Sequence, residues 1–243
     1  MVAASYQDRV FRKLRCRHIQ VDEMWAFIGA KQKNVTPKIA AENPHAGDIW
    51  LWTAIDADSK IVPCWMLSAG RDADVASQFL YDLRQRLVNR VQLSSDGHKA
   101  YLEGVDYAWS GMNVDYAMLV KLYSESSEAE KRYSPAQCIG CKSTVVVGNP
   151  DPAHISTSFA ERQNLSVRMS VRRYTRLTNA FSRKLKNHAA AVALYYFAYN
   201  FIKIHRTLRT SPAMAAGVTD RLWEVSDLVA LLEADERGLE RAA

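Results

Sequence analysis

Runs of apolar residues predict a series of β-strands in the first half of the chain. Residues 18–28 read HIQVDEMWAFI, and apolar side chains occupy both faces of this segment, as is typical of a strand in the interior of a sheet. Further strands are predicted at 49–55, 61–67, 91–95 and 115–123, with a short one at 144–147. Residues 30–47 and most of 124–157 are expected to form loops.

Apolar residues at helical intervals predict helices around these strands. Within residues 71–88, Val75, Phe79, Leu83 and Leu87 recur every four positions. Helices are also predicted at 98–109, from Thr157 onward, at 187–205 and at 225–232. Three successive strands favour an antiparallel meander, and the strand–helix–strand order that follows favours parallel pairing. We therefore expect an α/β fold with a mixed sheet flanked by helices.

The composition is that of a globular protein. Of the 243 residues, 48% are hydrophobic and 24% are charged. The longest mainly apolar stretch, 189–199, is shorter than the roughly 20 residues of a membrane-spanning helix, and no signal segment opens the chain. A cytoplasmic location is expected. Cys138 and Cys141 have the spacing of a zinc-binding pair, but no second pair accompanies them.

Charge is distributed unevenly along the chain. The net charge is +6, yet residues 162–219 contain eleven Lys and Arg and no Asp or Glu, so the rest of the chain carries −5 (6 − 11). Such segregation favours a polyanionic partner. The alternative is that the positive charges only keep this surface soluble and bind no partner.

Three carboxylates occupy unusual positions. Asp22 lies inside a predicted strand, where Asp is disfavoured, Asp96 ends another strand before Gly97, and Glu161 lies in the first turn of a helix. Each position has a purely structural interpretation. Asp22 could pair with a buried Arg, Asp96 could cap the next helix, and Glu161 could form a capping box with Ser158.

Taken together, the three carboxylates indicate a metal site. Carboxylates without nearby Cys or His ligands suit Mg²⁺ or Mn²⁺. If the strands that carry Asp22 and Asp96 are neighbours, the two side chains can share one ion, and Glu161 can complete a second site. Two ions about 3.5–4 Å apart are a recurrent device for breaking phosphodiester bonds.

Several segments resemble one family. The chain resembles the DDE transposases of bacterial insertion sequences, specifically the insertion-sequence-one-like group. The matching segments cover most of residues 6–232 and are VDEMWAFI at 21–28, SSDGHKAY at 94–101, VDYAMLVKLY at 114–123, GNPDPAHISTS at 148–158, FAERQNL at 159–165 and YNFIKIHRTL at 199–208.

This resemblance implies an RNase H-like fold with a five-stranded mixed sheet and a basic C-terminal helical extension. It also implies that Asp22, Asp96 and Glu161 are the catalytic triad and hold two divalent ions, Mg²⁺ or Mn²⁺. The implied activity is cleavage of transposon ends and joining of the 3′-hydroxyl to target DNA. The implied partners are DNA and further copies of the chain, as a homodimer or larger multimer near the bacterial nucleoid, with no membrane involved.

The expected organisation has three parts. Residues 1–17 form a basic N-terminal arm, 18–184 the catalytic domain with insertions at 30–47 and 124–157, and 185–243 the helical extension. Relatives usually carry a DNA-binding region before the core, whereas 21 residues precede Asp22 here. We therefore expect a catalytic core that binds DNA weakly and with little sequence preference.

Candidate DNA-binding residues follow Glu161. Asn164 and Arg168 are three and seven residues further along the predicted helix and so share its face with Glu161. The full set is Arg162, Asn164, Arg168, Arg172, Arg173, Arg176, Lys184 and Lys186. Two alternative functions remain open, namely a metal-dependent nuclease of the same fold and an inactive transposase remnant that binds DNA.

Overall fold

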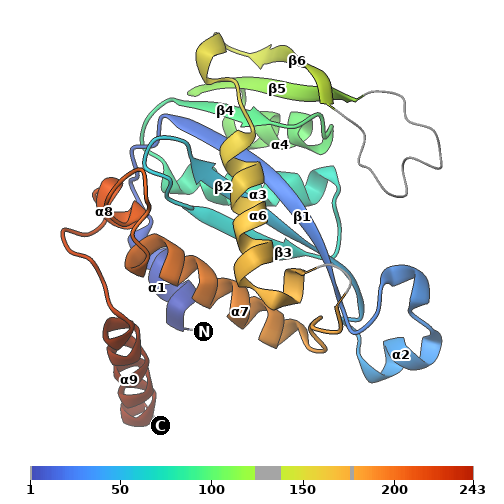
Figure 1. The fold of residues 1–243 in the computed structure, drawn as a ribbon, viewed down its shortest axis with the longest axis vertical. Coiled ribbons are helices and arrows are strands. Elements are labelled where there is room, and N and C mark those ends of the chain that lie inside the picture. The colour runs from blue at the N-terminus through green and yellow to red at the C-terminus, as the bar shows by residue number, and fades with distance from the viewer. Residues whose placement is uncertain (1, 124–137, 176–177, 243) are drawn as a thin grey trace.

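The protein is described by a computed structural model that covers residues 2–123, 138–175 and 178–242. Six of the described segments form one sheet in the order β3-β2-β1-β4-β5-β6 (Figure 1). They are β1 (His18–Ile28), β2 (Gly47–Asp56), β3 (Cys64–Ser68), β4 (Val91–Ser95), β5 (Val114–Tyr123) and β6 (Cys138–Val147). β2 and β3 continue antiparallel from β1, whereas β4 and β5 run parallel to it.

The predicted α/β fold with a mixed sheet is therefore confirmed. The order and directions of β1 to β5 are those of the RNase H-like fold that the resemblance implies. These five strands begin and end within three residues of their predicted bounds. The five-stranded sheet that the resemblance implies is one strand short, because residues 138–147, of which the sequence predicts only 144–147 as a strand, form a complete sixth strand antiparallel to β5. Most of its side chains are exposed, so its sequence lacks the apolar alternation that reveals a strand.

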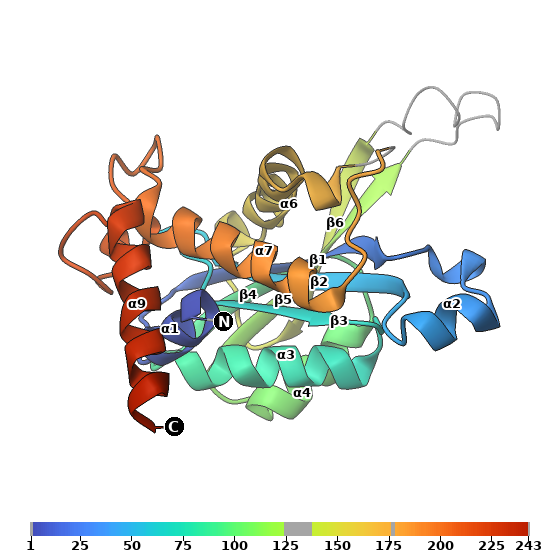
Figure 2. The same ribbon diagram turned by 90° about the horizontal axis from the view of Figure 1, so that it is seen from below.

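Helices cover both faces of the sheet. Figure 2 shows α3 (Ala73–Arg86) and α4 (Ala100–Trp109) on one face, and α6 (Ser158–Ser170) and α7 (Leu185–Phe197) on the other. Two buried apolar clusters correspond to these layers. Val21 of β1 belongs to the cluster with α3 and α4, and Met24 belongs to the cluster with α6 and α7, because successive strand residues point to opposite faces.

Residues 30–47 are not entirely a loop. They include η1 (Gln32–Asn34) and α2 (Pro37–Glu42). The Thr36 hydroxyl accepts a hydrogen bond from the Ile39 amide, and Pro37 occupies the first helical position. Both are standard signals for a helix start, and they override the low apolar content of this segment.

The N-terminal residues form α1 (Val2–Val10), which packs against the C-terminal part of the chain. The Tyr6 ring lies 5.6 Å from that of Phe201 and 5.1 Å from that of Trp223. The side chain of Gln7, which is 3% exposed, accepts a hydrogen bond from the Asn200 amide. Asn200 lies in η4 (Ala198–Ile202), a π-helical turn that continues α7. Residues 2–10 are thus joined to the end of α7.

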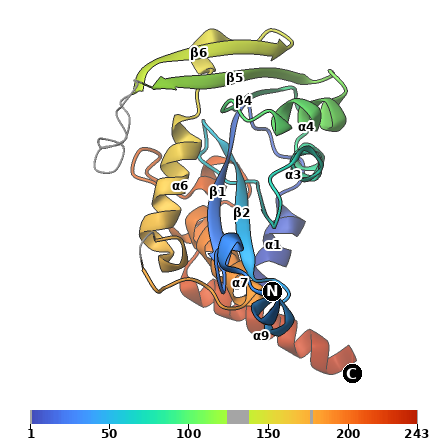
Figure 3. The same ribbon diagram turned by 90° about the vertical axis from the view of Figure 1, so that its right-hand side faces the viewer.

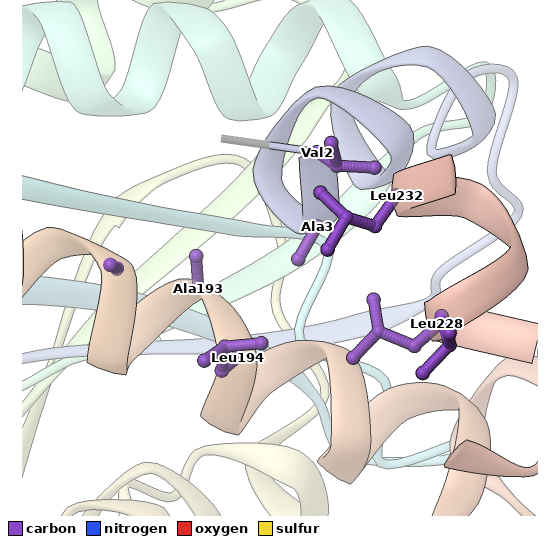
Figure 4. Close-up of a pocket in the computed structure, with 8 residues that line it drawn as sticks. Val2, Ala3, Ala193, Leu194, Leu228 and Leu232 are labelled. Carbon is purple, nitrogen blue, oxygen red and sulfur yellow. The ribbon is translucent and has the colours of Figure 1, made fainter. Parts of the chain in front are cut away.

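The last helix, α9 (Val225–Ala242), extends beyond the predicted 225–232. Its first half meets α1 and α7 around an apolar pocket of about 300 Å³. In Figure 4, Leu232 of α9 lies next to Ala3 of α1, and Leu228 of α9 faces Leu194 of α7. α8 (Pro212–Ala215) lies in the connection between α7 and α9. None of the helices in the described ranges has both the length and the apolar character needed to cross a membrane.

A buried histidine ties the end of the α6 layer to α7. The imidazole of His188 is fully buried and hydrogen bonds to the Ser182 hydroxyl at 2.9 Å and to the Tyr174 hydroxyl at 2.7 Å. Tyr174 ends η3 (Arg172–Tyr174), the turn after α6. Burial, with a smaller contribution from the Arg173 charge, lowers the pKa of His188 to about 4. The neutral imidazole is therefore the form that supports this junction.

The pKa of His188 predicts a loss of stability in mild acid. Its stabilising contribution is present above the unfolded-state pKa of about 6.5 and is lost as the pH falls toward 4, because the unfolded chain takes up the proton first. Between pH 7 and pH 4, the wild type should lose about 3 kcal/mol of unfolding free energy more than His188→Gln loses. Urea unfolding across this range measures the difference. His45→Gln, at an exposed position, is the control, and equal pH slopes for wild type and His188→Gln would contradict the assignment.

Candidate active site

Asp22 and Asp96 lie side by side because of the register of two parallel strands. β1 pairs with β4 through three residues, the last pair being Gln20 with Ser94. Asp22 follows Gln20 by two residues, and Asp96 follows Ser94 by two residues. The two aspartates therefore lie side by side, on the same face of the sheet. Carboxylate oxygens of Asp22, Glu23 and Asp96 lie within 4.8 Å of one another.

A single glutamine brings α6, and with it Glu161, to this position. The side-chain oxygen of Gln20 accepts hydrogen bonds from the backbone amides of Phe159, at 2.7 Å, and Ala160, at 3.2 Å. It therefore satisfies two of the amides that the start of a helix leaves unpaired. Gln20 and Asp22 share a face of β1, and Glu161 directly follows Ala160, so Glu161 is held over the same end of the sheet.

The three predicted catalytic carboxylates line one cavity of about 440 Å³. Asp22 lies on β1, Asp96 directly follows β4, and Glu161 lies on α6, which runs beside β1 (Figure 3). β5 forms a further wall. The lining residues are Asp22, Arg71, Asp96, Gly97, His98, Leu119, Val120, Lys121, Tyr123, Thr157 and Glu161.

Among the described residues, none of the three carboxylates has the purely structural role that its local sequence allows, namely an ion pair with a buried Arg, a helix cap or a capping box. Within the described parts of the chain, Asp22 forms no ion pair and accepts hydrogen bonds from the Glu23 amide and from the Asn164 side chain. Asp96 accepts from the His98 amide in a turn before α4, which begins at residue 100. Glu161 does not form a capping box with Ser158, because its carboxylate accepts from the Thr157 hydroxyl instead.

Glu161 has a basic partner that the sequence pattern did not reveal. Lys121 of β5 forms an ion pair with the Glu161 carboxylate, whose other oxygen accepts the hydrogen bond from the Thr157 hydroxyl at 2.7 Å. The hydrogen bond to Glu161 raises the pKa of Lys121. Lys121 comes from a distant strand, and no local pattern links it to Glu161.

Glu23 is the second residue that the sequence analysis missed. Its side chain is 1% exposed, and the Tyr101 hydroxyl of α4 donates a hydrogen bond to its carboxylate at 2.6 Å. Arg71 donates to the same carboxylate at 2.6 Å through Nε and forms an ion pair with it. The Arg71 guanidinium also lies 4.9 Å from the ring centre of Trp50. Glu23 thereby fixes Arg71 at the cavity wall and supports the strand beneath Asp22.

The electrostatics at Asp22 indicate a place for positive charge. Burial first, and then the negative charges of Glu23, Asp96 and Glu161, raise the pKa of Asp22 to about 7. The side-chain oxygen of Asn164 is buried and has no hydrogen-bond partner among the described residues, although the amide nitrogen donates to Asp22 at 2.8 Å. The oxygens of these carboxylates and the unpaired side-chain oxygen of Asn164 are the kind of ligand atoms that bind a hard cation such as Mg²⁺.

The predicted DNA-binding residues differ in their exposure and in the part of the structure that they face. Asn164 and Arg168 share the face of α6 that looks toward β1, as predicted, since Arg168 contacts the Met24 sulfur at 3.2 Å. Arg173 is half-buried and donates to the Ser182 hydroxyl. The exposed members are Arg162, Arg172, Lys184 and Lys186. Arg176 lies outside the described residues.

The cysteine pair does not join a metal-binding cluster among the described residues. Cys138 and Cys141 are exposed and free on β6. The group of metal-ligating side chains found in the described ranges consists of Asp22, Glu23 and Asp96.

Comparisons with known proteins give weak structural likenesses. No protein-family model and no curated protein matches the sequence. A piggyBac transposase in a synaptic complex with hairpin DNA is similar over 76% of this chain and 46% of its own, at 8% identity and a TM-score of 0.38. The Aquifex aeolicus Argonaute is similar over 86% of this chain and 29% of its own, at 11% identity and a TM-score of 0.31. This chain thus spans less than half the length of either, and the fold assignment rests on the strand order.

The raised pKa predicts that Asp22 destabilises the metal-free protein. Because the unfolded chain loses this proton near pH 4 and the folded protein near pH 7, the destabilisation develops as the pH rises between these values and is complete above pH 7. Asp22→Asn should therefore unfold with roughly 4 kcal/mol more free energy than wild type at pH 8, and the difference should vanish near pH 4. Urea titrations in EDTA at pH 4, 6 and 8 provide the measurement. The exposed Asp106→Asn is the control, and a destabilised Asp22→Asn at pH 8 would refute the electrostatic explanation.

Proposed function

We propose that the chain is a transposase of the insertion-sequence-one-like group that cleaves DNA at transposon ends and joins the 3′-hydroxyl to target DNA. The observation that carries this proposal is the convergence of Asp22, Asp96 and Glu161 on one cavity of an RNase H-like sheet. The resemblance of the sequence to insertion-sequence transposases supports DNA cleavage and strand joining as the reaction. The acid-free stretch that begins at residue 162 adds the polyanionic partner.

Two divalent ions, Mg²⁺ or Mn²⁺, are proposed as cofactors. Asp22 and Asp96 would hold one together, and Asp22 or Asp96 with Glu161 would hold the other. When bound, such ions supply Lewis-acid activation of the attacking oxygen and stabilisation of the leaving oxygen.

The neighbouring residues prepare the site for a phosphodiester. Asn164 orients Asp22 through its hydrogen bond, and Thr157 and Lys121 orient Glu161. Arg71, at 37% side-chain exposure, presents positive charge at the cavity wall. A guanidinium at this position favours the approach of a phosphate.

The proposed function predicts that each triad carboxylate is essential for cleavage. Asp22→Asn, Asp96→Asn and Glu161→Gln should each reduce Mg²⁺- or Mn²⁺-dependent nicking about a thousandfold or more, since metal-assisted charge stabilisation supplies several kcal/mol. The assay combines labelled transposon-end duplex with a supercoiled target plasmid. Glu103→Gln, an exposed substitution on α4, is the matched control. Mn²⁺ should also raise the melting temperature of wild type and Glu103→Gln, but not that of Asp22→Asn.

The same assay separates the proposal from its alternatives. Nicked and joined products confirm a transposase. Nicking without joined products assigns the chain to the metal-dependent nucleases. A wild type that binds DNA but neither cleaves it nor gains stability from Mn²⁺ is the inactive remnant.

DNA affinity should depend on the exposed cations of the acid-free stretch. The triple substitution of Arg172, Lys184 and Lys186 by Ala should weaken binding to any duplex and reduce the slope of log affinity against log salt by about 2–3, because each phosphate contact contributes about 0.9. Fluorescence anisotropy at several salt concentrations measures this slope. The comparison triple, Arg12, Arg15 and Arg17 to Ala, removes equal charge from the N-terminal residues and should change it less. Equal slopes for the two triples would show that net charge alone sets the affinity.

A further inference from the structure

An aromatic pocket lies beyond the carboxylates on β1. Trp25 and Phe27 of β1 and Phe181, in the segment before α7, surround a cavity of about 370 Å³, with the cations of Lys31 and Arg173 in its wall. The ring of Phe27 lies 5.7 Å from that of Trp25 and 4.9 Å from that of Phe181. The aromatic pocket is defined here by these five residues.

The three rings are not part of the hydrophobic core. Trp25, Phe27 and Phe181 are all half-buried, and none belongs to either buried cluster or to the side chains packed against them. Exposed aromatic surface in a cavity is costly unless something covers it. The pocket therefore has apolar, planar walls that the fold itself does not use.

The chemistry of the walls matches a nucleotide. Aromatic rings stack with bases of any sequence, and cations beside them pair with the attached phosphates. The ammonium of Lys31 lies 5.6 Å from the ring centre of Trp25. A base stacked on this ring would therefore have the Lys31 cation close to its attached phosphates. Arg173, held by the Ser182 hydroxyl at 3.2 Å, supplies a second, fixed cation.

The edge of β1 connects the aromatic pocket to the carboxylates. In the described structure, β4 pairs with this edge as far as Gln20, and the next backbone partner on it is Ser182, which bridges Ile28. The edge between these points runs from Asp22 past Trp25. The side chains of Asp22 and Trp25 point to opposite faces of β1, so a nucleic-acid strand that reaches both has to cross this edge. Three strand residues span roughly 10 Å, which is the length of about three stacked nucleotides at 3.4 Å each.

We propose that the aromatic pocket receives an unpaired base of the DNA strand whose phosphate lies at the carboxylates, about three nucleotides away. This inference rests on the proposed function and adds a substrate requirement to it. The preferred DNA has an unstacked or single-stranded segment beside the scissile bond, and the base stacks on Trp25 and Phe181 while Lys31 and Arg173 contact its flanking phosphates.

The test uses 2-aminopurine, a base whose fluorescence falls when it stacks on an aromatic ring. A duplex with a five-nucleotide unpaired 3′ segment carries the probe at each unpaired position in turn, and binding is measured in EDTA so that no cleavage occurs. Wild type should quench the probe strongly at one position, near the third unpaired nucleotide. It should also bind this DNA about five- to tenfold more tightly than the fully paired duplex of the same sequence.

Matched variants identify the pocket. Trp25→Leu should abolish the quenching and the five- to tenfold preference, while Trp25→Phe, which keeps a ring, should retain part of both. Tyr107→Leu removes an aromatic ring of 65% exposure from α4 and should behave as wild type. If Trp25→Leu does not fold, Phe181→Leu replaces it with the same expectation.

The outcomes separate this inference from the proposed function. Equal quenching in wild type and Trp25→Leu, or equal affinity for paired and unpaired DNA, overturns the base-binding pocket even if the triad variants lose cleavage. Position-specific quenching that depends on Trp25 supports it even if cleavage proves independent of the triad, in which case the proposed function fails alone.

Discussion

The candidate site depends on three residue pairs of parallel sheet between β1 and β4. This short ladder ends two residues before the carboxylates on both strands, so its register aligns Asp22 with Asp96. Gln20, within the same ladder, holds the first amides of α6 and so places Glu161. Residues 18–22 of β1 thus position all three carboxylates. The helices on either side of the sheet stabilise this segment through two separate apolar clusters.

Two buried groups give the molecule opposing responses to pH. Asp22 destabilises the metal-free fold when it is ionised, and His188 destabilises it when it is protonated. The first effect grows as the pH rises from 4 to 7, and the second grows as the pH falls over nearly the same interval. The two effects therefore partly offset each other, and the unfolding free energy of the metal-free protein should vary less between pH 4 and pH 7 than either group alone would make it vary.

Local sequence was sufficient for part of the structure. Periodicity predicts the strands β1 to β5, the helices α3 and α4, and the shared face of Asn164 and Arg168, because each depends on residues close in the chain. β6 was missed in its first half because its side chains are exposed and its partner is β5. Lys121 and the roles of Glu23 and Arg71 depend on contacts between segments 40 or more residues apart, and no pattern within one segment encodes such contacts.

Asp22 and Glu23 are consecutive carboxylates on opposite faces of one strand, and this arrangement has a consequence for changes in chain length. Inserting or deleting one residue between Gln20 and Glu23 would exchange the two faces, so that the buried partner of Arg71 and Tyr101 would enter the cavity and Asp22 would enter the core. The connection from β1 to β2 bears no such constraint, because η1 and α2 have no buried residues. Related chains should therefore vary freely in length at 32–46 while keeping residues 18–23 free of insertions and deletions.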